Sequence, residues 1–274
     1  MNYRHAFHAG NHGDCLKHAL LVWLLAAMQR KPGGVFVLDT HAGIGRYDLD
    51  AGPATRTGEA KRGIRRLLDA PPPPLADYIA LVHRLGLYPG SPWLVRALLR
   101  PQDRLACCEL HPDDATALKR LFARDPQVAV HHRDAWESLV ALLPPRTGEK
   151  RALVLIDPPY EAEDEFERLA QGLATAHRRM KGAVLAAWYP IKHRAPTRAF
   201  HAALVASGVR DIVAAELWLR APLDPTRLNG SGLLLVNPPF GFEGAARATL
   251  PALLDRLGDG EEGAGWDVAR IVDE

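Results

Sequence analysis

The stretch ALVLIDPPY, residues 152–160, joins an apolar run to a polar, proline-containing end. The run is too short for a helix and rich in aliphatic residues, so it predicts a buried parallel strand. The two prolines end the strand, because neither can donate a hydrogen bond to a sheet. Asp157 and Tyr160 then lie at the carboxyl end of a strand, where open α/β sheets bind ligands. A carboxylate and a ring there can hold a planar amino-heterocycle, although Asp-Pro is also common in ordinary turns.

A glycine-bearing turn, Thr40 to Gly45, follows another apolar strand, VFVLD at 35–39. Glycine lets a cofactor approach the backbone closely. The turn is not a complete G-x-G-x-x-G pattern, so its meaning depends on the strands that come after it.

Acidic side chains end the next strands that the sequence predicts. Glu109 closes the strand at 104–110 and can accept hydrogen bonds from ribose hydroxyls. Asp134 follows the strand at 128–132 and can accept from an adenine amine. Any one of these groups could be an ordinary loop carboxylate. A glycine turn, Glu109, Asp134 and Asp157 in this order are improbable by chance, and they predict a nucleotide-cofactor site.

Helices separate these strands, and the alternation continues along the chain. The pattern predicts an α/β fold with a doubly wound, seven-stranded, mostly parallel sheet of the Rossmann-like class, closed by a hairpin. A Gly- and Glu-rich stretch follows the last helix. The remaining strands are expected at 183–188, 211–219 and 232–236, and the helices at 112–124, 135–143, 163–178, 196–207 and 243–257.

A second Pro-Pro motif, NPPF at 237–240, resembles DPPY. Its strand is joined to the preceding strand without a helix, so the two strands run antiparallel. The carboxyl end of that strand then faces the edge of the sheet opposite to the glycine turn. We therefore assign the chemistry to Asp157 and a structural turn to Asn237.

The helix that should follow the glycine turn is interrupted by residues 46–90, which are polar and contain several prolines. We expect a small inserted helical subdomain there, and a main domain formed by residues 1–45 and 91–274. Ser91 is expected to cap a helix at 92–100, which returns the chain to the glycine turn. The insertion also carries basic residues that are candidates for phosphate contacts, although each could equally belong to a solvated helix face. These residues are Lys61, Arg62, Arg65 and Arg66.

The N-terminal arm, residues 1–13, is rich in histidine. Asp14 is expected to cap the helix that follows, whose leucines recur at helical spacing. Four histidines and Cys15 between residues 5 and 18 suggest zinc, but their spacing offers no matched ligand pairs, so we expect no metal. The arm can instead contact phosphates and stack on bases, or be an ordinary solvated terminus. The side chains concerned are Tyr3, Arg4, His5, His8, Asn11 and His12.

Length and composition limit the class of protein. A chain of 274 residues, 47% of them hydrophobic, allows one large or two small domains with a sizeable core. The net charge of +2 neither requires nor excludes a nucleic acid, so any RNA-binding surface has to be local. Three cysteines form no disulfide framework. With no signal peptide and no apolar run of membrane-spanning length, we expect a cytoplasmic protein, as a monomer without an obligate protein partner.

Taken together, the motifs resemble those of the bacterial RlmJ family, S-adenosylmethionine-dependent methyltransferases that act on the N6 amine of an adenine in 23S ribosomal RNA. The resemblance covers nearly the whole chain. The N-terminal block is specific to that family, whereas DPPY is shared by many amino-methyltransferases. The matching segments are YRHAFHAGNHGDCLKH (3–18), LDTHAGIGRY (38–47), RTGE (56–59), YPGSP (88–92), ELHP (109–112), LIDPPYE (155–161), AWYP (187–190) and SGLLLVNPPF (231–240).

The resemblance implies a role for each matching residue. Asp157 would accept a hydrogen bond from the target amine, Pro158 would present its carbonyl to the second amine hydrogen, and Tyr160 would stack on the adenine. Tyr3 would touch the RNA substrate near the active site. Residues implied to line the S-adenosylmethionine site are Lys17, His18, His41, Ser91, Glu109, Asp134, Ala135 and Asp157.

Three other functions use some of the same features. A DNA N6-adenine methyltransferase would share DPPY, but the N-terminal block argues against it. A catalytically silent RNA-binding module would use the arm and the insertion without binding a methyl donor. A nicotinamide dehydrogenase would share the fold class, but DPPY has no role in hydride transfer.

Overall fold

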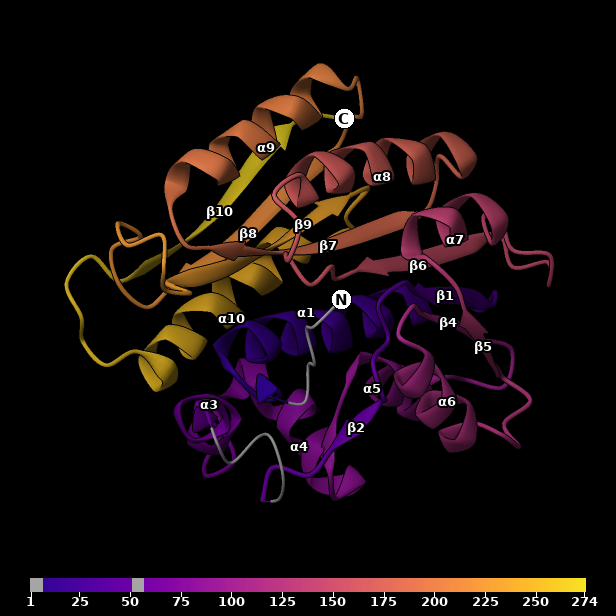
Figure 1. The fold of residues 1–274 in the computed structure, drawn as a ribbon, viewed down its shortest axis with the longest axis horizontal. Coiled ribbons are helices and arrows are strands. Elements are labelled where there is room, and N and C mark those ends of the chain that lie inside the picture. Colours follow the sequence, from indigo (N-terminus) through magenta and orange to yellow (C-terminus); the bar gives the residue numbers. More distant parts are fainter. Residues whose placement is uncertain (1–6, 51–56) are drawn as a thin grey trace.

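Eight strands form one twisted sheet in the part of the chain that the structure, a computed structural model, describes, residues 7–50 and 57–274. Their order is β10-β8-β9-β7-β6-β1-β4-β5 (Figure 1). Five neighbouring strands are parallel, and β9 runs antiparallel between β7 and β8. This confirms the predicted α/β fold class. The bounds are β1 (Val35–Asp39), β4 (Arg104–Glu109), β5 (Val128–His132), β6 (Arg151–Ile156), β7 (Val184–Ile191), β8 (Ile212–Trp218) and β9 (Gly230–Val236).

The sheet has one strand more than the seven that the sequence predicts. β10 (Gly265–Val272) pairs antiparallel with β8 and forms one edge of the sheet. Of its eight residues only Val268 is fully buried. Because the strand lies at an edge and is half exposed, it lacks the continuous apolar run by which the buried strands are recognised.

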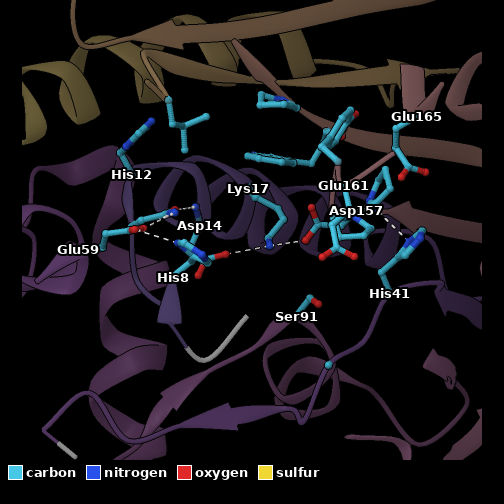
Figure 2. A pocket seen from close by; sticks show the side chains of 18 of the residues that line it. His8, His12, Asp14, Lys17, His41, Glu59, Ser91, Asp157, Glu161 and Glu165 are labelled. Carbon is cyan, nitrogen blue, oxygen red and sulfur yellow. Dashed lines mark hydrogen bonds and ion pairs between the residues drawn. The ribbon is translucent and has the colours of Figure 1, made fainter. Parts of the chain in front are cut away.

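The first helix, α1 (His12–Gln29), begins earlier than predicted, and Asp14 is not its cap. Asn11 is the cap residue, because its backbone is extended and its side-chain oxygen accepts from the Asp14 N–H at 2.9 Å. Asp14 lies within the first turn instead. There its carboxylate and the ammonium of Lys17 face a pocket at the carboxyl ends of the parallel strands (Figure 2).

The cap prediction for Ser91 is also wrong. α5 (Ser91–Leu98) starts at Ser91 itself, and Gly90 holds the cap position without a side-chain hydrogen bond. The backbone N–H of Gly90 donates to the carbonyl of Gly45 at 2.9 Å. The start of α5 is thus tied to the glycine turn, as the sequence suggested, but through the backbone rather than through the Ser91 hydroxyl.

Helices cover both faces of the sheet (Figure 1). Strand side chains alternate between the two faces: in β1, Val35 and Val37 join the core that contains α1, while Phe36 and Leu38 join the opposite core. The first core also contains residues of α5, α6 (Pro112–Leu121) and α10 (Phe242–Leu257). The second is covered by α7 (Ala135–Ala141), α8 (Glu165–Arg179) and α9 (Arg194–Ala206).

The inserted segment packs against α1 rather than standing apart. It opens and closes with the antiparallel pair β2 (Arg46–Tyr47) and β3 (Tyr88–Pro89). Between them lie α3 (Glu59–Arg62), η2 (Ile64–Arg66), η3 (Pro73–Leu75) and α4 (Ala76–Leu85). Ile64, Tyr78 and Ile79 are buried in the same core as α1. The division into a main domain and a subdomain stays a prediction.

Two of the four basic residues proposed for phosphate contacts pair with acids inside the protein. Arg65 forms an ion pair with Asp50, and Arg66 forms one with Asp259 at 2.7 Å. Their charge is therefore partly neutralised by the fold.

Among the described residues, no helix is both long enough and apolar enough to cross a bilayer.

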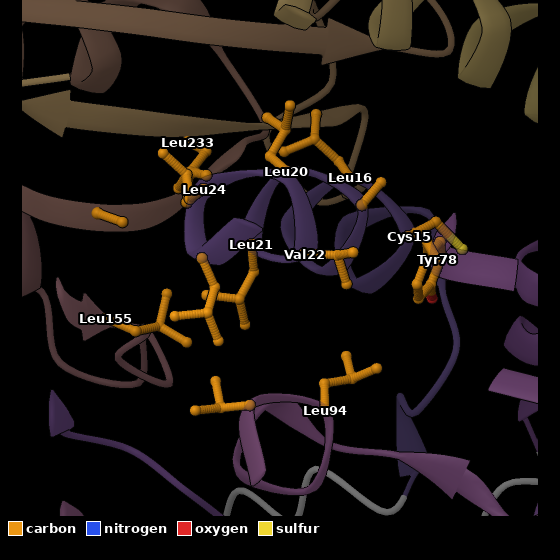
Figure 3. Packing of buried hydrophobic residues seen from close by; sticks show 14 of the residues in the cluster. Cys15, Leu16, Leu20, Leu21, Val22, Leu24, Tyr78, Leu94, Leu155 and Leu233 are labelled. Atoms are coloured by element: carbon orange, nitrogen blue, oxygen red, sulfur yellow. The ribbon is translucent and has the colours of Figure 1, made fainter. Parts of the chain in front are cut away.

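The buried leucines of α1 should contribute to stability. Leu24 is fully buried and packs beside Leu233 of β9 (Figure 3). Leu24→Ala should lower the free energy of unfolding by about 2–5 kcal/mol, because it removes apolar contacts and leaves a cavity. Urea denaturation measures this. Val205→Ala, at a side chain that is 55% exposed, is the matched control and should change stability by less than about 0.5 kcal/mol. Equal effects of the two substitutions would contradict this account of the core.

Candidate active site

A cavity of about 1060 Å³ lies at the carboxyl ends of the parallel strands. Its walls include the glycine turn after β1, Glu109 at the end of β4, and the DPPY turn after β6. This is the position at which open α/β sheets bind ligands. Tyr3 falls outside the described residues. All other predicted site residues line the cavity: Lys17, His18, His41, Ser91, Glu109, Asp134, Ala135, Asp157, Pro158 and Tyr160.

Lys17 joins two carboxylates at the centre of the cavity (Figure 2). Its Nζ lies 2.6 Å from Oδ2 of Asp157 and 2.8 Å from Oδ1 of Asp14. Burial of the ammonium opposes its charge, but the two carboxylates outweigh this effect and raise the pKa of Lys17. Lys17 therefore stays charged and holds one oxygen of Asp157 in a fixed position.

His41 holds the DPPY turn from the other side. The backbone N–H of Asp157 donates to Nδ1 of His41 at 3.3 Å. Nδ1 can accept this bond only if it carries no proton. Burial lowers the pKa of His41 to about 4, against the attraction of Asp157 and Asp134. A neutral imidazole thus supports the backbone of Asp157 while Lys17 supports its side chain.

Tyr160 adopts a left-handed backbone conformation, with a φ of 53°. This conformation is uncommon for a bulky residue and occurs where the surroundings enforce it. The Tyr160 hydroxyl donates to the carbonyl of Trp188 at 2.9 Å. The ring lies edge-on to Trp188 and tilted against Phe166, with centroids 5.8 and 5.1 Å away. The turn therefore presents an aromatic wall beside Asp157.

Glu109 and Asp134 both accept hydrogen bonds from the backbone. Glu109 takes the N–H of Gly43 on Oε2 at 2.8 Å and that of His111 on Oε1 at 2.7 Å. Burial raises the pKa of Glu109, and these two N–H groups oppose the shift. Asp134 caps α7 by accepting from the Trp136 and Glu137 N–H groups. Both acids thus shape the cavity wall, besides any contact with a ligand.

Gly43 shows why this turn carries glycine. Its φ is +61°, and an added Cβ would lie 2.5 Å from the Tyr47 hydroxyl. A side chain at this position would be strained and crowded. The glycine allows the turn to pass close to the cavity.

The second Pro-Pro motif lies away from this cavity. β9 runs antiparallel to β7, as the sequence predicted. Asn237, which follows β9, therefore lies at the amino ends of the parallel strands, opposite to the cavity. The Asn237 amide donates to the carbonyls of Lys181 and Ala183, both at 2.8 Å. Within the described chain, none of residues 237–240 lines the cavity. Asn237 therefore fixes a turn.

Sequence reasoning missed the contributions of Asp14, Asp39 and Glu59. Asp14 was assigned to a cap, and Glu59 appeared only within a matching segment. Asp39 ends β1, is fully buried, and has one carboxylate oxygen without a hydrogen-bond partner. A charged residue that closes an otherwise apolar strand, VFVLD, was the available signal for Asp39.

The cavity fits a cationic ligand that carries amine and hydroxyl donors. Glu109, Asp134 and Asp157 line it and offer carboxylate acceptors, and the ammonium of Lys17 is already paired with Asp14 and Asp157. S-adenosylmethionine has a positive sulfur, an ammonium, a ribose diol and an adenine amine, and so matches this set of acceptors. Among residues 7–50 and 57–274, no cluster of three or more metal-ligating side chains is found.

The sheet order and the glycine turn at the carboxyl ends of its parallel strands define a Rossmann-like α/β fold. A family model described as "Ribosomal RNA large subunit methyltransferase D, RlmJ" matches residues 32–272. The chain belongs to this RlmJ family of S-adenosylmethionine-dependent ribosomal RNA methyltransferases.

Full-length relatives support this membership. A Haemophilus influenzae protein named ribosomal RNA large subunit methyltransferase J is 38% identical, over 100% of both chains. An Escherichia coli protein of the same name is 38% identical over 98% of this chain and 99% of its own. A crystal structure from Legionella pneumophila has a TM-score of 0.87 at 32% identity, covering 96% of this chain and 98% of that one.

Asp39 should make stability depend on pH. Burial raises its pKa to about 6 from an ordinary 3.8, and Asp157 adds to the shift while the Ser91 hydroxyl opposes it. The folded state therefore keeps a proton that the unfolded chain releases, and the stability this contributes is lost as pH rises through about 6. From pH 4 to 7, wild type should lose about 2–3 kcal/mol relative to Asp39→Asn.

Chemical denaturation across this pH range measures the difference. Asp255→Asn, at an exposed position of α10, is the control and should follow wild type. Parallel pH curves for wild type and Asp39→Asn would contradict the shifted pKa.

Proposed function

We propose that this protein transfers a methyl group from S-adenosylmethionine to the N6 amine of an adenine in 23S ribosomal RNA. The observation that carries the proposal is the Asp157 carboxylate, which follows β6 directly and is held by Lys17 in the cavity lined by the glycine turn and Glu109. Membership of the RlmJ family and the names of the relatives support the choice of ribosomal RNA.

Asp157 and Pro158 would activate the amine by hydrogen bonding. The adenine amine is a poor nucleophile because its lone pair is delocalised into the ring. A carboxylate that accepts one amine hydrogen, and a carbonyl that accepts the other, favour a pyramidal nitrogen with its lone pair exposed. Lys17 holds the Asp157 carboxylate and His41 holds the Asp157 backbone before the substrate arrives, so catalysis would rely on positioning and preorganised charge.

The remaining residues would bind and orient the reactants. When bound, S-adenosylmethionine supplies an electrophilic methyl group on a positively charged sulfur. The Tyr160 ring offers a face for stacking of the target base, which has to leave its RNA stack to reach the cavity. Glu109 and Asp134 offer acceptors for the ribose and adenine of the methyl donor, and Tyr3 is proposed to contact the RNA.

Asp157→Asn and Asp157→Ala should each lower methylation of 23S RNA by at least about 100-fold, because the preorganised acceptor is lost. S-adenosylmethionine should still bind, as measured by calorimetry. Asn237→Ala is the matched control from the second Pro-Pro motif and should keep most of the activity below its melting temperature. Full activity of the Asp157 variants would contradict the assignment of Asp157. Loss of methylation in Asn237→Ala alone would mean that NPPF, not DPPY, carries the chemistry.

The substrate can be identified with labelled methyl donor. Protein-free 23S RNA, intact 50S particles and duplex DNA are incubated with the protein, and the nucleosides are then separated. We expect label in N6-methyladenosine from RNA, because the family is one of ribosomal RNA methyltransferases. Label in DNA alone would favour a DNA methyltransferase. No label and no binding of S-adenosylmethionine would favour a silent RNA-binding module.

A further inference from the structure

The inserted segment and the turn before α1 meet through both backbone and side chains. Thr57 donates its hydroxyl to the Phe7 carbonyl at 2.7 Å, and the Ile64 N–H donates to the Gly10 carbonyl at 2.8 Å. The two backbones touch at Gly63, where an added Cβ would lie 1.9 Å from the Gly10 oxygen. Contacts this close require glycine and fix the relative position of the two segments.

Glu59 in the insertion binds two side chains of this turn (Figure 2). One oxygen lies 2.8 Å from Nδ1 of His8, and the other accepts from the Asn11 amide at 3.0 Å. The hydrogen bond with Glu59 raises the pKa of His8, although burial opposes it. Both oxygens of Glu59 are thus committed to residues that lie just before α1.

Asn11 transmits this contact to the helix. Its amide nitrogen is held by Glu59, while its amide oxygen caps α1 by accepting from the Asp14 N–H at 2.9 Å. A change at Glu59 would therefore free the cap residue to rotate.

Asp14 links the first turn of α1 to Lys17, and through Lys17 to Asp157. Its Oδ2 accepts from the Gly10 N–H at 2.9 Å, and its Oδ1 lies 2.8 Å from the Lys17 ammonium. Lys17 in turn holds Asp157 at 2.6 Å. The path from the insertion to the carboxylate consists of short polar contacts, and Asp14 and Lys17 in it are buried.

We propose that Glu59 is a positioning residue for methyl transfer: by fixing His8 and Asn11 it holds the first turn of α1, so that Asp14 and Lys17 set the place of the Asp157 carboxylate. The inference rests on the proposed function of Asp157. It gives the insertion a role in assembling the active site, separate from the phosphate contacts that its basic residues suggest.

The test compares Glu59→Ala, Glu59→Gln and, as matched control, Asp69→Asn, which removes one charge from an exposed position of the same segment. In Glu59→Ala, kcat on 23S RNA should fall on the order of 10- to 100-fold, because reacting groups lose their alignment. KM for RNA, affinity for S-adenosylmethionine and melting temperature should change little. Glu59→Gln should recover much of kcat, since its amide can bridge Asn11 and a neutral His8. Asp69→Asn should match wild type.

Hydrogen exchange gives a readout that does not need activity. In Glu59→Ala, the amides of the first two turns of α1 should exchange faster, while those of the remainder of the helix stay protected. If kcat is unchanged, or if it falls only in parallel with melting temperature and cofactor affinity, the proposal is overturned. A rise in KM without faster exchange would mean that Glu59 contacts the substrate directly, which also overturns it.

The two proposals fail differently. If wild type does not methylate RNA, the proposed function is wrong, yet hydrogen exchange still reports whether Glu59 holds the first turn. If wild type is active and Glu59→Ala shows neither slower turnover nor faster exchange, only the role of Glu59 is lost.

Discussion

The ion triad of Asp14, Lys17 and Asp157 is the interaction on which the site depends. Removing charged groups from water costs several kcal/mol per ion, and short, well-aligned contacts are needed to offset it. Here one ammonium that is 4% exposed serves two carboxylates at 2.8 and 2.6 Å. The triad keeps a net negative charge, next to further acids in the cavity wall. That excess is complementary both to a cationic methyl donor and to the N–H donors of an amine.

A lysine can hold this place because α1 is rigid. The helix is buried along most of its length, because it packs on β9 of the sheet and has α5, α10 and α4 of the inserted segment as neighbours. Figure 3 shows Leu233 of β9 and Leu94 of α5 beside it. Such packing restricts both translation and rotation of the helix. Lys17 and Asp157 are 140 positions apart in sequence, and a mobile segment could not keep their side chains at hydrogen-bond distance. Sites supported by packed elements are more accurately placed than sites built on loops.

The sequence predicted those features that depend on local pattern. Buried strands, the turns that end them and the direction of the NPPF strand all follow from short-range rules, and the structure agrees with them. The failures have physical causes. β10 is a half-exposed edge strand without a continuous apolar run. Asn and Asp are both common cap residues, so the sequence could not distinguish Asn11, which is the cap, from Asp14. The contacts of Lys17 and Glu59 join distant segments, which no local pattern encodes.

The two Pro-Pro turns show how much a motif alone determines. Tyr160, the last residue of DPPY, and Asn237, the first residue of NPPF, both have a φ of 53°, so the left-handed residue lies at opposite ends of the two motifs. Asparagine tolerates this conformation, whereas in a tyrosine it costs of order 1–3 kcal/mol, which the surroundings have to offset. The contacts of Tyr160 with the Trp188 carbonyl and with two aromatic rings can offset it. The side-chain amide of Asn237 instead donates to two backbone carbonyls. A Pro-Pro turn by itself only ends a strand. The DPPY turn is the candidate catalytic site because Lys17 and His41 hold Asp157 in the cavity.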